Sequence, residues 1–172
     1  MATKRQIFYS FHYDNDVTRV QQIRNIGALE ENAPVSHNDW ENVKKGGDSA
    51  IKKWIDNNMN NRSCIVVLVG EQTSKRPWVK YEIEKAWNDG RGVVGIYIHN
   101  LIDMRYSKIA PRYGKSIKGS NPFDLFTMQN DNNKKLSSIV KCYEPKINDA
   151  YNDIKQNIEK WIEEAIQIRD NY

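Results

Sequence analysis

Two short, almost wholly apolar runs constrain the fold of this 172-residue chain more than any other feature. They are Cys64–Gly70 (CIVVLVG) and Val93–Ile98 (VVGIYI). Runs of this length without polar alternation are typical of strands that are covered on both faces of a parallel sheet. Between them, Pro77 stands where the first turn of a helix tolerates proline, and apolar residues recur at helical spacing until Asn88. This order predicts a βαβ unit with a right-handed crossover.

The rest of the chain continues the alternation of strand and helix. A first strand is predicted at 6–11, a helix at 17–26 with Asp16 as its N-cap, a short strand at 33–36, a helix at 48–59, a last strand at 138–143 and a long amphipathic helix at about 147–170. Alternation of this kind predicts an α/β fold, with a parallel sheet and helices on both faces. In such sheets ligands bind beyond the carboxyl ends of the strands.

A long connection over 99–136 separates the last two predicted strands. It contains two prolines, two glycines and an Asn/Lys tract, and it is longer than the ordinary connections of compact domains. Segments of this kind are usually functional or mobile. We expect the connection to be an insertion within a single domain that spans residues 1–172.

The composition excludes several classes of protein. Hydrophobic residues make up 39% of the chain, with five Trp, nine Tyr and four Phe, so the chain has enough anchors for a core and is not disordered. Lys and Arg exceed Asp and Glu by only four and form no basic block, which argues against nucleic acid as a partner. No apolar run approaches the roughly 20 residues that cross a bilayer, and the N-terminus carries no signal-peptide pattern. We therefore expect a cytoplasmic protein without a membrane segment.

The cysteines and histidines give no pattern for a disulfide or a metal. Cys64 and Cys142 lie in separate apolar stretches, and His12, His37 and His99 are scattered. No Cys-x-x-Cys pair is present, so we expect no metal site and no structural disulfide.

Helical geometry separates two neighbouring acids on the helix after Gly70. Glu84 has Lys80 and Asn88 four residues to either side, which places it on the solvated face. Glu82 instead has Trp78 one turn before it and borders the apolar stripe. A carboxylate held against an indole at this edge of the sheet has the properties of an active-site acid. The alternative is an ordinary surface glutamate that pairs with Lys85.

Other candidate features are weaker. The loop Phe11–Asp14 offers aromatic faces and an imidazole, which suit a flat heteroaromatic ligand, although His12 alone is also typical of an ordinary loop. The cluster at 37–40 and the pair Gly46-Gly47 are compatible with plain turns, and no phosphate-binding glycine fingerprint is present. Asp14 and Asp16 are similar to the acidic pair of phospho-acceptor receivers, but no aspartate follows Val69 to accept a phosphoryl group.

Several of these segments together resemble the TIR-like proteins of the Thoeris anti-phage defence system. They are FYSFHYDND, WENVKKGGDSAIKKWID, CIVVLVGEQTSKRPWVKYEIEKAW, GVVGIYIHNLID and NPFD, and the resemblance covers nearly the whole chain. Its most specific element is the spacing of Trp78 and Glu82, because the family places a Trp four residues before a catalytic Glu. The resemblance implies a flavodoxin-like TIR fold with about five parallel strands.

The resemblance also implies an activity, which is cleavage of the nicotinamide–ribose bond of NAD. The ADP-ribosyl group would then be cyclised or conjugated as a signal, with NAD as substrate and no separate cofactor. Glu82 would be the catalytic carboxylate that offsets positive charge on the ribose. The implied substrate-binding residues are Phe11, His12 and Tyr13 on the nicotinamide or ribose side, Trp40 and Trp78 as walls, and Lys44 or Arg76 at the phosphates.

Partners follow from the same resemblance. We expect a homo-oligomer on activation, a separate effector that senses the nucleotide product, and a phage protein as a trigger. The alternative function is a catalytically silent TIR-like module that acts by self-association or by sensing a phage component. The identity of the product and the resting oligomeric state stay open.

Overall fold

The computed structural model describes residues 5–26, 42–105 and 115–172. Its centre is a sheet in the order β1-β2-β3-β6, in which all neighbouring strands are parallel. The strands are β1 (Ile7–Ser10), β2 (Cys64–Val69), β3 (Gly92–Tyr97) and β6 (Cys142–Tyr143). The two apolar runs thus form the adjacent central strands, as predicted.

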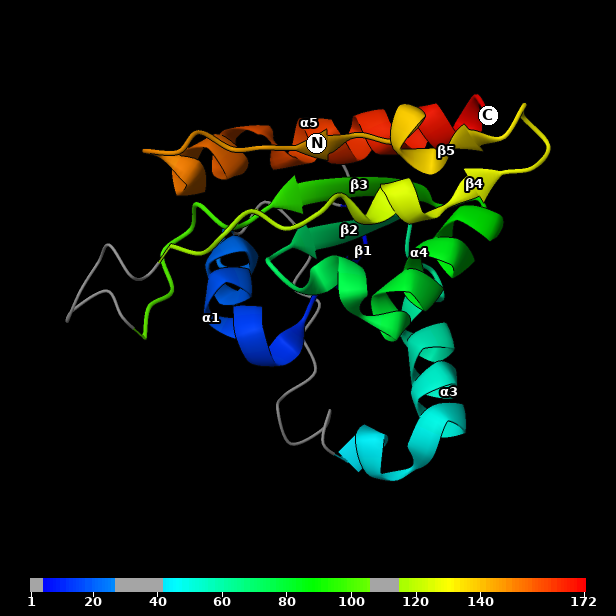
Figure 1. Ribbon diagram of the computed structural model, residues 1–172, viewed down its shortest axis with the longest axis horizontal. Helices are drawn as coiled ribbons and strands as arrows, with labels where there is room; N and C mark the ends of the chain where they lie inside the picture. The colour runs from blue at the N-terminus through cyan, green and yellow to red at the C-terminus, as the bar shows by residue number, and fades with distance from the viewer. Residues whose placement is uncertain (1–4, 27–41, 106–114) are drawn as a thin grey trace.

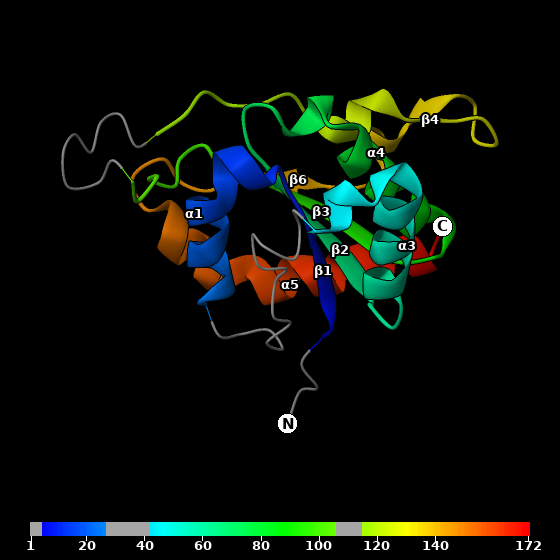
Figure 2. The same ribbon diagram turned by 90° about the horizontal axis from the view of Figure 1, so that it is seen from below.

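The helices cover both faces of this sheet (Figures 1 and 2). They are α1 (Tyr13–Arg24), α3 (Gly47–Met59), α4 (Pro77–Asn88) and α5 (Ala150–Asp170), and a short 3₁₀ helix η1 (Thr73–Lys75) leads into α4. One hydrophobic cluster joins α1 and α5 to the sheet, and a second joins α3 and α4 to its other face. The described sheet therefore sits between two helical layers.

Alternate residues of β2 enter opposite clusters, which explains the unbroken apolar run. Cys64, Val66 and Leu68 belong to the α1–α5 cluster. Ile65, Val67 and Val69 belong to the α3–α4 cluster. Both faces of this strand are covered by helices and neither faces solvent, so all six residues are buried.

The connection between β3 and β6 has secondary structure of its own. It carries the 3₁₀ helix η3 (Pro122–Leu125), the antiparallel pair β4 (Thr127–Met128) and β5 (Lys134–Lys135), and the 3₁₀ helix η4 (Leu136–Ser138). Phe123 and Leu136 are fully buried in the α3–α4 cluster. The segment is thus partly anchored to the core rather than being one open loop.

Three predicted boundaries are wrong. The last strand is confined to β6, because Ser138 closes η4 and the Val140 amide donates to the Leu136 carbonyl in a turn. The final helix begins at Ala150 and leaves Ile147 exposed, because the Lys146–Asp149 turn precedes it. The first helix begins at Tyr13 with His12 as its N-cap, so Asp16 lies inside the helix.

The resemblance implied about five parallel strands, and this number is approximate. Four parallel strands are present in the described residues. The strand predicted at 33–36 lies outside them. Within the described part, no helix is both long and apolar enough to cross a bilayer.

Close packing of α5 on β3 generates a test of the fold. A Cβ added at Gly92 would lie 2.8 Å from the backbone nitrogen of Ile166 in α5. Since backbone cannot yield as a side chain can, Gly92→Ala should lower the free energy of unfolding by about 1–3 kcal/mol. Urea denaturation followed by circular dichroism measures this. Ser49→Ala, on an exposed position of α3, should stay within about 0.5 kcal/mol of wild type, and an equal loss in both variants would contradict the packing.

Candidate active site

Glu82 points from α4 into the protein, towards the carboxyl end of β1. Only 8% of the residue is exposed. The Ser10 hydroxyl donates a buried hydrogen bond to Glu82 Oε2. The other carboxyl oxygen, Oε1, makes no hydrogen bond with the described residues. Helical spacing therefore predicted the direction of Glu82 correctly.

The alternative pairing with Lys85 is wrong. Lys85 Nζ lies 2.9 Å from Asp89 Oδ2 and 3.8 Å from Asp56 Oδ1, on the outer side of α4. Glu84 is exposed, as its polar neighbours indicated. The two acids of this helix therefore occupy different environments although they are two residues apart.

Burial controls the protonation of Glu82. Loss of solvent raises the pKa of the Glu82 carboxyl to about 8, and the Ser10 hydrogen bond opposes part of this rise. The free protein at neutral pH therefore holds a mainly neutral carboxylic acid at this position. A positive charge placed beside it would favour ionisation.

Ser10 is a site residue that inspection of the sequence missed. It lies inside the apolar run of the first strand, where alternation turns Ser10 and Phe8 towards the α3–α4 layer. Ser10 is fully buried. A lone hydroxyl on the inner face of such a strand needs a buried hydrogen-bond partner. That requirement could have indicated Ser10 as a site residue.

A second buried acid occupies the α1 side of the same sheet edge. Asp16 is 2% exposed and lies 3.5 Å from Arg19 Nη1. A Cβ on Gly70 would lie 2.2 Å from Asp16 Oδ2, so only glycine allows the carboxylate this close to the end of β2. Burial raises the pKa of Asp16 to about 6, and the Arg19 guanidinium lowers it in part. Asp16 therefore lies against the end of β2, inside α1, instead of capping the helix.

The other predicted substrate-binding residues are placed as follows. Trp78 is half-buried at the start of α4, with its ring 5.9 Å from that of Tyr81 in an edge-to-face contact. Tyr81 donates to Asp56 Oδ1 at 2.7 Å, which links α4 to α3. Phe11 packs partly against the α1–α5 cluster, and His12 is half-buried at the N-cap of α1.

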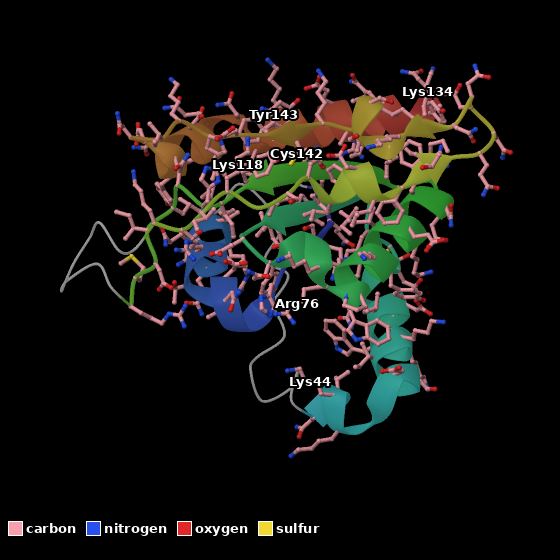
Figure 3. All side chains as sticks on the ribbon, viewed as in Figure 1. Lys44, Arg76, Lys118, Lys134, Cys142 and Tyr143 are labelled. Atoms are coloured by element: carbon pink, nitrogen blue, oxygen red, sulfur yellow. The ribbon has the colours of Figure 1, made fainter. Side chains whose placement is uncertain are left out.

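The two cations predicted to bind the phosphates are exposed. Arg76 forms the N-cap of α4, and Lys44 precedes α3. Figure 3 shows both on the lower side of the view, with Lys44 by the segment that leads into α3. Trp40 and the side chain of Tyr13 lie outside the described residues. Roles for these residues towards a substrate stay predictions.

Comparison with known proteins identifies the family at this point. The model of the family described as "Thoeris protein ThsB, TIR-like domain" matches residues 8–103. The chain belongs to this family. The matched range begins in β1 and ends after β3, so it contains both Ser10 and Glu82.

One relative of this ThsB-type chain is named "Putative cyclic ADP-D-ribose synthase ThsB1" and comes from Bacillus cereus (strain MSX-D12). The two are 38% identical over an alignment of 130 residues that covers 73% of this chain. The aligned part spans 64% of the length of that relative. The family assignment agrees with the parallel sheet and with the flavodoxin-like TIR fold expected from the sequence.

The raised pKa of Glu82 predicts how stability depends on pH. The folded protein holds a proton on Glu82 up to about pH 8, whereas an unfolded glutamate loses it near 4.5. The folded state therefore binds more protons between these values, and its stabilisation is lost as pH rises through about 8. The loss for one proton is at most about 1.4 kcal/mol per pH unit.

Glu82→Gln removes this dependence, so its stability relative to wild type should increase from pH 5 to pH 8. Chemical denaturation at a series of pH values measures the difference. Glu84→Gln, on the exposed face, serves as the control and should follow wild type. Parallel pH profiles for wild type and Glu82→Gln would mean that the buried carboxyl titrates normally.

Proposed function

We propose that this ThsB-type chain cleaves the bond between nicotinamide and ribose in NAD. The ADP-ribosyl group then forms a cyclic or conjugated signal for a separate effector. The observation that carries the proposal is a buried carboxyl, Glu82, with one oxygen held by Ser10 and the other without a hydrogen bond to the described residues. The name of the relative as a cyclic ADP-D-ribose synthase supports the same reaction class.

The main requirement of this reaction is one negative charge placed near the ribose. The bond from ribose C1′ to the nicotinamide nitrogen breaks, and its electron pair leaves with nicotinamide as a neutral molecule. Positive charge remains on C1′ and the ring oxygen of the ribose. An ionised Glu82 near the ribose hydroxyls stabilises this charge, as carboxylates do in glycoside hydrolysis.

Substrate binding supplies the charge that ionises Glu82. The nicotinamide ring of NAD is cationic, and a cation near a buried carboxyl lowers its pKa. The proton of Glu82 is released to solvent, and the carboxylate remains paired with Ser10. The site thus becomes anionic when the cationic substrate arrives.

The fate of the ribosyl cation decides the product. A hydroxyl or ring nitrogen of the same substrate closes a cyclic product, an external amine or hydroxyl gives a conjugate, and water gives free ADP-ribose. An attacking hydroxyl, amine or water loses a proton to solvent after its new bond to C1′ forms, whereas a ring nitrogen attacks with its lone pair and has no proton to lose. The proposal also includes self-association on activation, because a neighbouring subunit would exclude water from the site.

Removal of the carboxylate charge should abolish the reaction. Glu82→Gln keeps the shape of the side chain and should lower nicotinamide release at least about 100-fold, because charge stabilisation in the transition state is lost. Liquid chromatography of purified protein, and NAD levels in phage-challenged cells, measure the effect. Glu84→Gln should retain nearly full activity. Equal activity of both variants and wild type would favour the silent interaction module instead.

The pH dependence of the rate tests the protonation step. Since the ionised carboxylate is the active form, kcat/KM should rise with pH and level off above about 8. Ser10→Ala removes the hydrogen bond that lowers the pKa of Glu82, so the midpoint should move to higher pH. A profile with an unchanged midpoint in Ser10→Ala would exclude Ser10 as the positioning residue.

A further inference from the structure

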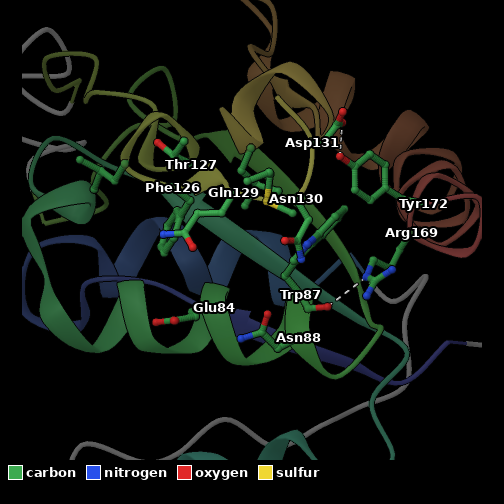
Figure 4. Close-up of a pocket in the computed structure, with 13 residues that line it drawn as sticks. Glu84, Trp87, Asn88, Phe126, Thr127, Gln129, Asn130, Asp131, Arg169 and Tyr172 are labelled. Atoms are coloured by element: carbon green, nitrogen blue, oxygen red, sulfur yellow. Dashed lines mark hydrogen bonds between the residues drawn. The ribbon is translucent and has the colours of Figure 1, made fainter. Parts of the chain in front are cut away.

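A cavity of about 780 Å³ lies at the opposite end of α4 from its N-cap Arg76. Its walls are the last turns of α4 and α5 and the segment around β4 and β5 (Figure 4). Glu82 faces the carboxyl end of β1, whereas the cavity contains Trp87 and Asn88, just before the start of β3. The cavity is therefore separate from the candidate active site, and its chemistry has to be explained on its own.

One wall of the cavity is a rigid cluster of aromatic and cationic side chains. The Arg169 guanidinium lies 4.6 Å from the centre of the Trp87 ring, and its Nε donates to the Trp87 carbonyl at 3.0 Å. The Tyr172 ring lies 5.5 Å from the Trp87 ring, and its hydroxyl donates to Asp131 (Figure 4). The terminal nitrogens of Arg169 make no hydrogen bond or ion pair with the described residues. Arg169 is thus held in place, and its terminal N–H groups can still donate to a ligand.

Three side-chain amides face this wall. Asn88 belongs to α4, and Gln129 and Asn130 extend from the hairpin towards α4 (Figure 4). All three residues are exposed, and their side chains make no hydrogen bond within the described part of the chain. Each amide offers a donor and an acceptor side by side. Such pairs match the donor–acceptor edges of a nucleobase.

The charges around the cavity limit what it can bind. Asp131 already accepts from Tyr172 and lies 3.3 Å from Lys134 Nζ. Glu84 also lines the cavity and forms no ion pair with the described residues. With one available guanidinium and one unpaired carboxylate, the cavity suits a ligand with a single small anionic group better than a polyphosphate.

We propose that this cavity binds a purine mononucleotide. The amides of Asn88, Gln129 and Asn130 would hold the edge of the base, the half-exposed Tyr172 ring would pack against it, and Arg169 would receive the phosphate. The volume lies within the range of small-molecule sites. This proposal rests on the cavity alone and does not depend on the reaction proposed for Glu82.

Titration of the full chain with AMP, followed by amide NMR, tests the proposal. Saturable shifts should occur at the backbone amides of residues 128–131 and 169–172. The double variant Gln129→Ala/Asn130→Ala should weaken binding at these amides at least tenfold, because it removes two recognition groups without disturbing the fold. Gln156→Ala, an exposed amide on α5 far from the cavity, should bind as wild type.

Two further titrations separate the possible results. Adenosine should bind at least tenfold more weakly than AMP, because it lacks the phosphate for Arg169. Glu82→Gln should show the same AMP shifts at the cavity, so an inactive Glu82 site and an empty cavity are distinguishable. Absence of shifts at these amides up to millimolar AMP, or equal affinity in the double variant, would overturn the proposal. Equal affinity for adenosine and AMP would overturn the role of Arg169.

Discussion

Burial of the central sheet on both faces is the constraint on which the site depends. The inner strands have no solvated face, so polar chemistry is confined to the strand ends and to helix positions that look towards them. Glu82 and Asp16 are both buried at the carboxyl edge, one on each side of the sheet. Asp16 has the Arg19 guanidinium of the same helix close by, which offsets part of the cost of its burial. Glu82 has only a hydroxyl and remains the acid that a ligand can change.

A carboxyl with a raised pKa makes the charge of the site conditional. A permanently ionised glutamate would carry the full desolvation cost in the free protein. A mainly neutral acid avoids that cost and becomes ionised only when a cation binds beside it. In the proposed reaction, this coupling would favour the cationic substrate over the neutral product, which suits departure of neutral nicotinamide. The Ser10 hydroxyl can donate its hydrogen bond to either form of the carboxyl.

Much of this could be predicted from the sequence, for physical reasons that can be stated. Apolar runs of strand length predicted β2 and β3, and helical spacing separated Glu82 from Glu84. The sequence does not indicate Ser10, because a small polar residue inside an apolar strand only interrupts the hydrophobic pattern. Its role becomes visible when its partner on α4 is known. Local rules predict Asp16 as a helix cap, whereas its place is decided by the absence of a Cβ on Gly70, which is distant in sequence. The cavity between α4 and α5 forms where these helices and the β4–β5 segment come together, and no local sequence pattern predicts such a contact.

The most direct test of the central claim is a crystal structure of the Glu82→Gln variant with NAD, since this variant should bind the substrate without consuming it. Our account predicts that the side chain of residue 82 lies within about 3.2 Å of a hydroxyl of the nicotinamide ribose. It also predicts that the other side-chain atom remains beside Ser10. NAD bound elsewhere, or with its nicotinamide ribose out of reach of residue 82, would contradict the account.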